Sequence, residues 1–197
     1  MFKNAAEAIV NKSQYLSELD MIGDADFGTN ISSGFEKILV SLSELDDPDI
    51  GNILSTAGQV FVFEIGSTIG GLVGRGFQAA GKQLRGKREL NAREFAEFLE
   101  IMLQTIQQVG GAKLGDKTLL DALIPAVTAA KAAAESGVTS IQRILKVAAK
   151  AAEEGANNTA SMVAKIGRAS YLGERSRGTV DPGAMFVYLF LNAMAQG

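Results

Sequence analysis

Apolar residues recur every three or four positions along nearly the whole chain, and alternation with a period of two is almost absent. This spacing gives each segment one apolar stripe at helical intervals, so it predicts an all-α protein. The segments predicted to be helical are residues 2–17, 29–44, 50–64, 67–84, 91–109, 117–136, 139–154, 157–166 and 182–195.

Residues typical of helix ends separate these segments. Asp47-Pro48 and Asp181-Pro182 each place an acid at the N-cap position before a proline at the first helical position. The glycines predicted to end helices are Gly110-Gly111, Gly137 and Gly155. No repeat, low-complexity tract or long linker divides the chain, and we expect residues 1–197 to form a single domain.

Residues 53–74 carry little charge and could mimic a membrane span. Glu64 lies among them together with several hydroxyl side chains, so we interpret the stretch as soluble helices whose glycines suit close packing. Residues 1–10 lack the apolar core of a secretory signal. We therefore expect a cytoplasmic protein without a membrane partner.

Histidine and cysteine are both absent from the chain. Their absence excludes a Ser-His-Asp triad, a thiol nucleophile and any imidazole or thiolate metal site. Any chemistry must use carboxylates, Lys, Arg, hydroxyls, backbone amides or a hard cation. The formal net charge of -3 argues against a nucleic-acid partner.

The first segment with chemical character is residues 19–30, where Asp20, Asp24 and Asp26 stand close together among glycines. Neighbouring carboxylates repel one another unless a cation lies between them. Ligands that are all oxygen suit Mg²⁺ or Ca²⁺. The alternative is a solvated Asp/Gly turn.

The second segment is the glycine-rich stretch 66–76, which begins with Ser67 and Thr68 after Gly66. Its glycines would let backbone N–H groups approach an anion, or would let two helices pack closely, and both interpretations stay open. Residues 76–82 match the phosphate-loop spacing G-x-x-x-x-G-K. We reject that match because no strand precedes it.

The third segment, residues 167–184, is rich in Arg, Gly and Ser and lies between predicted helices. It predicts a mobile lid that presents guanidinium groups to phosphate, with a plain solvated loop as the alternative. Together the three segments would supply metal-binding carboxylates, a glycine shelf and an arginine lid. Phosphoryl transfer depends on such positioning and charge neutralisation.

The most specific motifs are residues 19–30 with Gly34-Phe35, the Gly-Asp-Lys-Thr run at 115–118 with its continuation to 126, and residues 167–176 with 181–184. Over nearly the whole chain these motifs resemble the ADP-binding L subunits of bacterial dihydroxyacetone kinases. The resemblance implies an antiparallel, up-and-down barrel of about eight helices with a nucleotide at one end. The nine predicted segments would then have to become eight, by a merger near Gly66.

The resemblance also implies roles for individual residues. Asp20, Asp24 and Asp26 would bind two Mg²⁺ ions that hold ADP or ATP, and Arg168 would stabilise the transferring phosphoryl group. The residues implied to contact the nucleotide are Asn30, Gly66, Ser67, Thr68, Gly70, Thr118, Asp181 and Gly183.

By the same resemblance, the chain would pass a phosphoryl group to dihydroxyacetone or a related ketose held on a separate K subunit. A histidine phosphotransfer protein would recharge the nucleotide, because the chain has only the L part. Two alternatives remain: a related fatty-acid kinase domain that depends on a carrier protein, and a non-catalytic helical paralogue that binds a ligand or regulates.

Three positions depart from the pattern of the family. Phe27 stands where a histidine is usual, Ile69 replaces a serine, and the spacing from Asp20 to Asp24 is one residue short. On a helix, one residue turns a side chain by ~100°, which would make Asp20 the least secure metal ligand.

Overall fold

The computed structural model describes residues 1–21, 23–65 and 67–197, and this part of the chain contains helices and no strand. The all-α prediction is therefore confirmed. The elements are α1 (Phe2–Val10), α2 (Ser13–Leu19), α3 (Phe27–Ser43), α4 (Ile50–Glu64), α5 (Thr68–Gln83), α6 (Ala92–Gly110), α7 (Leu120–Glu135), α8 (Ile141–Asn158), η1 (Thr159–Ser161), η2 (Arg168–Ser176) and α9 (Pro182–Gln196).

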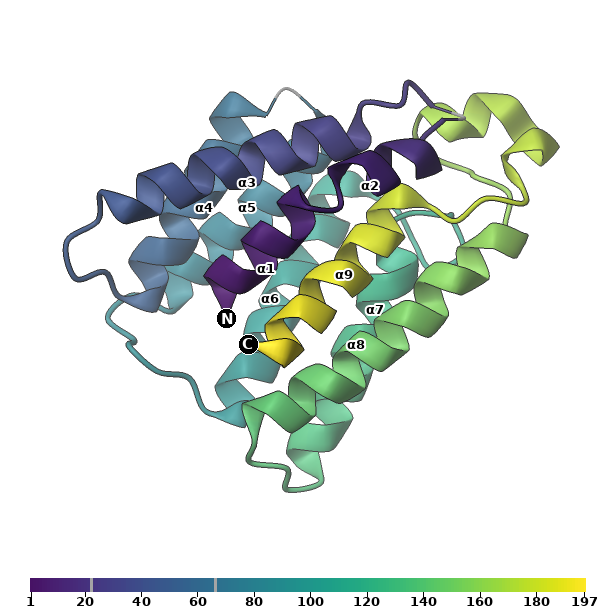
Figure 1. Ribbon diagram of the computed structural model, residues 1–197. Helices are drawn as coiled ribbons and strands as arrows, with labels where there is room; N and C mark the ends of the chain where they lie inside the picture. Colours follow the sequence, from purple (N-terminus) through teal and green to yellow (C-terminus); the bar gives the residue numbers. More distant parts are fainter. Residues whose placement is uncertain (22, 66) are drawn as a thin grey trace.

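The long helices form a closed ring of antiparallel neighbours (Figure 1). From α3 to α9 each helix packs against the next, and α1 closes the ring between α9 and α3. The short helix α2 continues from α1 along the same two neighbours. Because α1 and α2 share one position, the ring has eight positions, as the barrel prediction requires.

Phenylalanine rings from five helices fill the interior of this ring. Phe35 lies edge-on to Phe61 at a centroid distance of 5.1 Å and stacks with Phe190 at 5.6 Å. Phe77 stacks on Phe61 at 6.1 Å, and Phe2 from α1 meets Phe77 at 5.7 Å. Such pairs add to the free energy gained by burial, so this cluster ties the two ends of the chain to the middle of the barrel.

Two predicted helical segments and one merger of helices implied by the resemblance are wrong, whereas the separate segments 50–64 and 67–84 are confirmed. Residues 2–17 form two helices, since Asn11, a weak helix former, ends α1 and the chain turns before α2. The helices around Gly66 stay separate, because Ile65 and Ser67 both have extended backbones. Residues 157–166 are not an α-helix, since α8 runs on to Asn158 and only a short 3₁₀ turn follows.

Two predicted helix-end residues also have other roles. Asp49, not Asp47, is the N-cap of α4, and its carboxylate accepts a hydrogen bond from the backbone of Asn52 at 2.7 Å. Gly155 lies inside α8, where a Cβ would meet the backbone oxygen of Asp121 in α7. This glycine therefore allows α7 and α8 to pack closely and does not end a helix.

The glycine-rich segment is mainly a packing surface between α4 and α5. A Cβ on Gly74 would lie 2.9 Å from the carbonyl oxygen of Gly58, and a Cβ on Gly81 would lie 2.8 Å from that of Gly51. Since residues 76–82 are helical, they do not form a phosphate loop. Among the described residues, none of the helices combines the length and apolar character that a membrane crossing requires.

Two glycines of α5 should respond to substitution in opposite directions. Gly74→Ala would place a Cβ 2.8 Å from the Phe61 Cβ, so we expect the free energy of unfolding to fall by about 1–3 kcal/mol. Nothing lies within 4 Å of a Cβ at Gly71, and Gly71→Ala should raise it by about 0.5–1 kcal/mol. Urea unfolding of both variants measures this, and equal effects would contradict the proposed packing.

Candidate functional site

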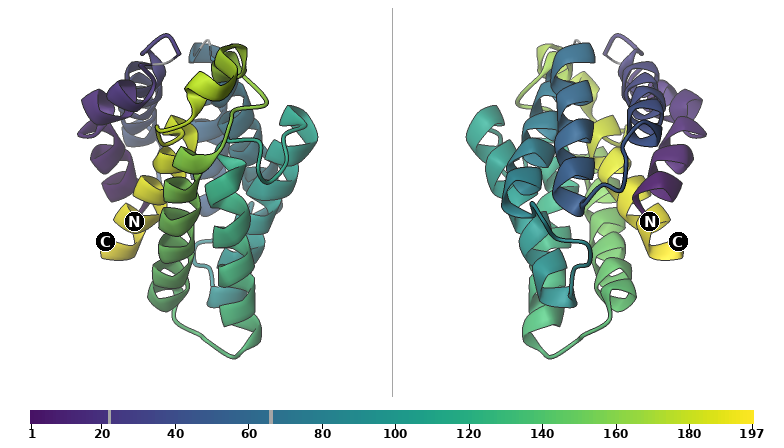
Figure 2. Two further views of the ribbon diagram at one scale, coloured as in Figure 1. Left: turned by 90° about the vertical axis from the view of Figure 1, so that its right-hand side faces the viewer. Right: turned by 90° about the vertical axis from the view of Figure 1, so that its left-hand side faces the viewer.

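Four chain connections meet at one end of the barrel, after α2, α4, α6 and α8 (Figure 2). Between them lies a cavity of about 360 Å³. Most residues that the sequence suggested for a site line this cavity: Asp20, Asp24, Asp26, Asn30, Ser67, Thr68, Thr118, Arg168, Asp181 and Gly183. Gly70 does not line it, because it packs against Ile65, and Gly66 lies outside the described residues.

The three aspartates form one acidic cluster at the mouth of the cavity. One carboxylate oxygen from each of Asp20, Asp24 and Asp26 lies within 4.8 Å of the other two. Helix α2 ends at Leu19, and Ala25 adopts a left-handed backbone with φ of 58°. In the described residues no helix joins Asp20 to Asp24, so the helical rotation expected from the shortened spacing does not separate their carboxylates, and Asp20 stays a predicted metal ligand.

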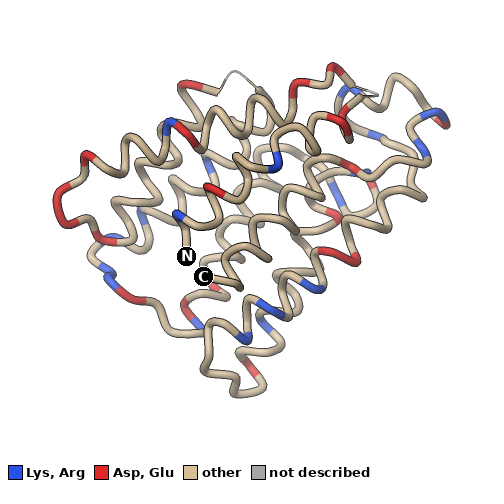
Figure 3. Tube along the Cα trace, in the orientation of Figure 1, with Lys and Arg blue, Asp and Glu red and all other residues tan. Residues whose placement is uncertain are grey.

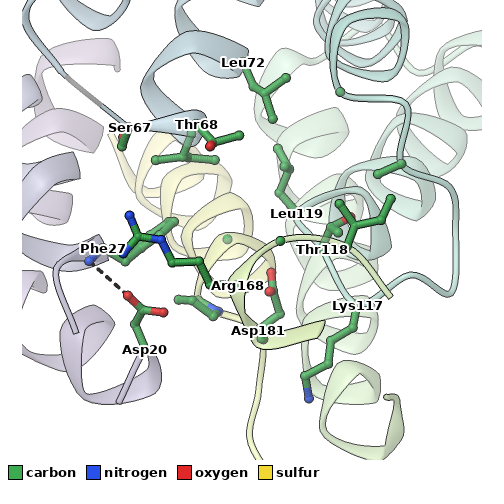
Figure 4. Close-up of a pocket in the computed structure, with 18 of the residues that line it drawn as sticks. Asp20, Phe27, Ser67, Thr68, Leu72, Lys117, Thr118, Leu119, Arg168 and Asp181 are labelled. Atoms are coloured by element: carbon green, nitrogen blue, oxygen red, sulfur yellow. Dashed lines mark hydrogen bonds between the residues drawn. The ribbon is translucent and has the colours of Figure 1, made fainter. Parts of the chain in front are cut away.

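Backbone contacts hold the acidic cluster in place. The carbonyl oxygen of Asp20 accepts hydrogen bonds from the amides of Gly23 at 2.7 Å and Ala25 at 3.2 Å. Its carboxylate accepts one from the amide of Phe27 at 3.3 Å (Figure 4). Burial raises the pKa of Asp20, an effect that the Phe27 amide partly offsets. Asp26 precedes α3 without a side-chain cap bond. The carboxylates thus fit a hard divalent cation.

Arg168 reaches across the cavity from the connection between α8 and α9 (Figure 4). Its guanidinium forms an ion pair with Asp24, although the side chain is otherwise largely exposed. Figure 3 shows acidic and basic positions side by side at this end of the molecule. The cluster therefore attracts a cation, and Arg168 can reach any group bound beside it.

Helix N-termini line much of the cavity. Phe27 and Asn30 belong to the first turn of α3, Thr68 begins α5, Leu120 begins α7 and Gly183 lies in the first turn of α9. The backbone N–H groups and the dipole of a helix N-terminus favour a bound anion. The site therefore offers an anion several helix starts beside an acidic cluster for its counter-cation.

The remaining wall of the cavity is apolar. Its apolar side chains include Ile69, Leu72, Ile106, Leu119 and Leu120. Ile69, which departs from the family pattern, belongs to this wall. The cavity can thus hold a ligand with an anionic end and a flat apolar end.

Two buried charged residues had no role in the sequence interpretation. The carboxylate of Asp121 accepts hydrogen bonds from the amides of Gly115 at 2.5 Å and Thr118 at 2.8 Å, which shapes the loop before α7. Lys117 is only 4% exposed and contacts the connection between α8 and α9. Both belong to the Gly-Asp-Lys-Thr motif and its continuation to residue 126, so the only indication of their importance in the sequence was their membership of that motif.

Comparison with known proteins assigns the family. Residues 21–196 match the DAK2 domain. The chain is 36% identical over 185 residues to the ADP-binding subunit DhaL of the PEP-dependent dihydroxyacetone kinase of Escherichia coli, covering 93% of this chain and 88% of that one. It is 34% identical over 195 residues to the corresponding subunit of kinase 2 of Listeria innocua, covering 96% and 88%. The chain belongs to the DAK2 domain family.

A solved structure has the same fold. The dihydroxyacetone kinase from C. freundii, in complex with AMP-PNP and Mg²⁺, superimposes with a TM-score of 0.76 at 25% identity. The match covers 99% of this chain and 32% of the C. freundii chain, so this protein spans about a third of that kinase.

Asp181 should make stability depend on pH. It is the N-cap of α9, and burial raises its pKa to about 7. The folded protein therefore keeps a proton that the unfolded chain releases near 3.8, so this residue lowers the free energy of unfolding as the pH rises from about 4 to 7. Asp181→Asn keeps an N-cap acceptor and should remove that decline, as measured by thermal unfolding without metal or nucleotide.

Asp49→Asn is the matched control, since Asp49 is also an N-cap. The Asn52 amide lowers the pKa of Asp49, so its stabilising effect is present at neutral pH and is lost as the pH falls through the acidic range. The two variants should therefore shift the pH profile in opposite directions. A profile unchanged by Asp181→Asn would show that Asp181 ionises normally.

Proposed function

We propose that this chain is the nucleotide-binding, phosphoryl-transferring subunit of a dihydroxyacetone kinase. The observation that carries the proposal is the meeting of an acidic cluster, several helix N-termini and Arg168 in one cavity. The relatives in E. coli and L. innocua are named ADP-binding subunits of such kinases, and the C. freundii kinase was solved with AMP-PNP and Mg²⁺. These names support the same assignment.

Each wall of the cavity has a separate task in this function. Asp20, Asp24 and Asp26 would hold Mg²⁺, which when bound neutralises and orients phosphate oxygens. Ser67 and Thr68 would offer the phosphates their hydroxyls and the N-terminus of α5. The apolar wall would bind the base of the nucleotide. The other residues proposed to contact the nucleotide are Asn30, Thr118, Asp181 and Gly183. Gly70 acts in packing, so we no longer assign it a contact with the nucleotide.

Arg168 would act on the group in transfer. Its guanidinium already lies at the acidic cluster, beside which the transferring phosphate would sit. Charge on the equatorial oxygens of a transferring phosphoryl group is stabilised well by a guanidinium. Because the pairing with Asp24 is exposed to solvent, Arg168 can exchange that partner for a phosphate oxygen.

The ketose substrate would sit on a separate K subunit that covers the mouth of the cavity. Large apolar side chains from three of the four connections are exposed at this end of the barrel: Met21, Leu114, Ile166 and Tyr171. Tyr171 is 89% exposed. Exposed apolar residues grouped around a site are typical of a surface that another protein covers.

The phosphoryl donor would be a histidine phosphotransfer protein. This chain has no histidine of its own to carry the group, and the E. coli relative is named PEP-dependent. A fatty-acid kinase domain is less well supported, because the named relatives are dihydroxyacetone kinase subunits. A non-catalytic paralogue is less well supported, because the three aspartates and Arg168, which the proposed transfer needs, all line the cavity. The single-domain organisation and the cytoplasmic location stay predictions.

Nucleotide binding should require Mg²⁺ and the charge of Asp26. Asp26→Asn keeps the shape of the side chain and a residue suited to the start of α3, but it removes one metal ligand. We expect affinity for Mg-ADP to fall at least about ten- to a hundredfold, the range for loss of a metal-supporting group. Calorimetry with and without Mg²⁺ measures it.

Asp49→Asn serves as the control for charge, because it is the same substitution at the N-cap of α4, at the opposite end of the barrel. It should leave the affinity unchanged. Wild-type affinity in Asp26→Asn would show that the acidic cluster is structural and would refute the site.

Arg168→Ala should slow transfer without weakening nucleotide binding. Stabilisation confined to the transition state affects kcat and not affinity. In a reaction reconstituted with the K subunit and the phosphoryl donor, we expect kcat to fall on the order of a thousandfold, as for other arginines in phosphoryl transfer. Arg175→Ala removes the same charge outside the cavity and should keep kcat. Full activity of Arg168→Ala, or rapid turnover by this chain alone, would overturn the mechanism.

A further inference from the structure

Lys117 holds a buried ammonium group whose partners are backbone carbonyls. Its Nζ donates to the oxygen of Thr179 at 2.6 Å, to that of Thr159 at 2.8 Å and to that of Met162 at 3.4 Å. The residue is only 4% exposed and its own φ is 60°, a left-handed backbone that turns the side chain into this place. Burying an ammonium group costs free energy of desolvation, which the three hydrogen bonds to carbonyls offset. A residue buried at such a cost is a candidate for a specific role.

The three carbonyls lie at the two ends of one connection. Thr159 caps the C-terminus of α8, Met162 follows the η1 turn, and Thr179 lies two residues before the N-cap of α9. We call residues 163–178 between these ends the lid, which replaces the range 167–184 predicted from the sequence. The ammonium therefore lies where the chain leaves α8 and where it returns to start α9.

Other hydrogen bonds join the same two ends. The amide of Asp181 donates to the hydroxyl of Thr159 at 2.8 Å, and the amide of Gly178 donates to the carbonyl of Ala160 at 2.8 Å. These bonds connect the ends of the lid to each other. Lys117, which belongs to the loop before α7, connects both ends to the wall of the cavity.

Arg168 depends on this base for its position. The lid contains glycines with φ of 75°, 54° and 101° at Gly167, Gly173 and Gly178, and beyond its base its described polar contacts with the barrel are those of Lys165 and Arg168. The Lys165 amide donates to the carbonyl of Asp116, the residue next to Lys117, at 3.1 Å. A chain with so many glycines holds a side chain accurately only if its base is fixed.

We propose that Lys117 is a positioning residue for phosphoryl transfer, which anchors both ends of the lid and so sets Arg168 over the acidic cluster. This inference rests on the function proposed above. Lys117 does not serve as a direct phosphate ligand, because its ammonium is occupied by carbonyls and extends away from Ser67 and Thr68 (Figure 4).

The charge of Lys117 also suits the electrostatics of this end of the barrel. Carbonyls at the C-terminus of α8 carry partial negative charge, which would repel a nearby phosphate. The ammonium lies against one of these carbonyls, that of Thr159, and faces Asp181. A neutral side chain of similar length would fill the space but would neither bind the carbonyls nor offset their charge.

Lys117→Met tests the proposal, with Lys150→Met as the control for loss of an exposed lysine, on α8 and away from the lid. In Lys117→Met we expect backbone amides of the lid to exchange hydrogen at least about tenfold faster while the amides of α4 and α5 keep their rates. In the reconstituted reaction kcat should fall on the order of a hundredfold, the cost of a small misplacement, with a much smaller change in Mg-ADP affinity. Lys150→Met should change none of these by a comparable factor.

A double variant separates positioning from simple loss of stability. If Lys117 acts through Arg168, Lys117→Met should cost little further kcat in a chain that already carries Arg168→Ala. Losses that multiply, unchanged exchange of the lid amides, or affinity that falls as much as kcat would each overturn the proposal. Should Lys117→Met fail to fold, Lys117→Gln is measured in the same way, since it removes the charge and keeps a polar side chain.

The hydrogen-exchange comparison also separates this proposal from the proposed function. A wild-type chain that transfers no phosphoryl group with its partners would refute the function. Faster exchange of the lid in Lys117→Met would then still show that Lys117 anchors the lid, whereas active wild-type protein with an unaffected lid refutes the anchor alone.

Discussion

The strict alternation of helix direction around a closed ring is the constraint on which the site depends. Because neighbouring helices are antiparallel, α3, α5, α7 and α9 all begin at one end of the barrel, and the cavity lies among their first turns. Each helix start carries roughly half a positive charge and unpaired N–H groups. An acidic chain with net charge -3 can therefore favour an anion at this end without a patch of basic side chains.

The same alternation brings the C-termini of α2 and α8 to that end of the barrel, and the residues beside these two C-termini carry opposite charges. The connection after α2 carries the acidic cluster, which makes the electrostatic potential there negative and favours a cation. After α8 the ammonium of Lys117 binds the carbonyl of Thr159 and offsets the negative helix end. An acidic cluster and several helix N-termini thus lie side by side, the combination that a metal-bound phosphate would need.

Features of the fold that depend on residues close together in the sequence could be predicted from the sequence. Periodicity alone gave the all-α class, and Asp181-Pro182 marked the start of α9 to the residue, because an N-cap acid followed by proline acts within one turn. Gly155 was misassigned because a glycine that ends a helix and one that allows α7 to approach look alike in sequence. The role of Lys117 could not be foreseen, since its acceptors are carbonyls 42 and 62 residues away and every residue has a carbonyl.

Phe27 shows how the core and the site are joined. Its ring meets Phe186 at 6.4 Å, and Phe186 in turn meets Phe35 at 6.1 Å and Phe190 at 6.0 Å, so aromatic contacts run from the acidic loop into the barrel. The backbone amide of Phe27 binds the carboxylate of Asp20. A residue without a polar side chain can therefore occupy the usual histidine position and still hold the loop, because the amide orients Asp20 and the ring fixes the amide. In the proposed function the family's histidine would be one side-chain donor toward phosphate, and without it that contact would come from helix N-termini and Arg168.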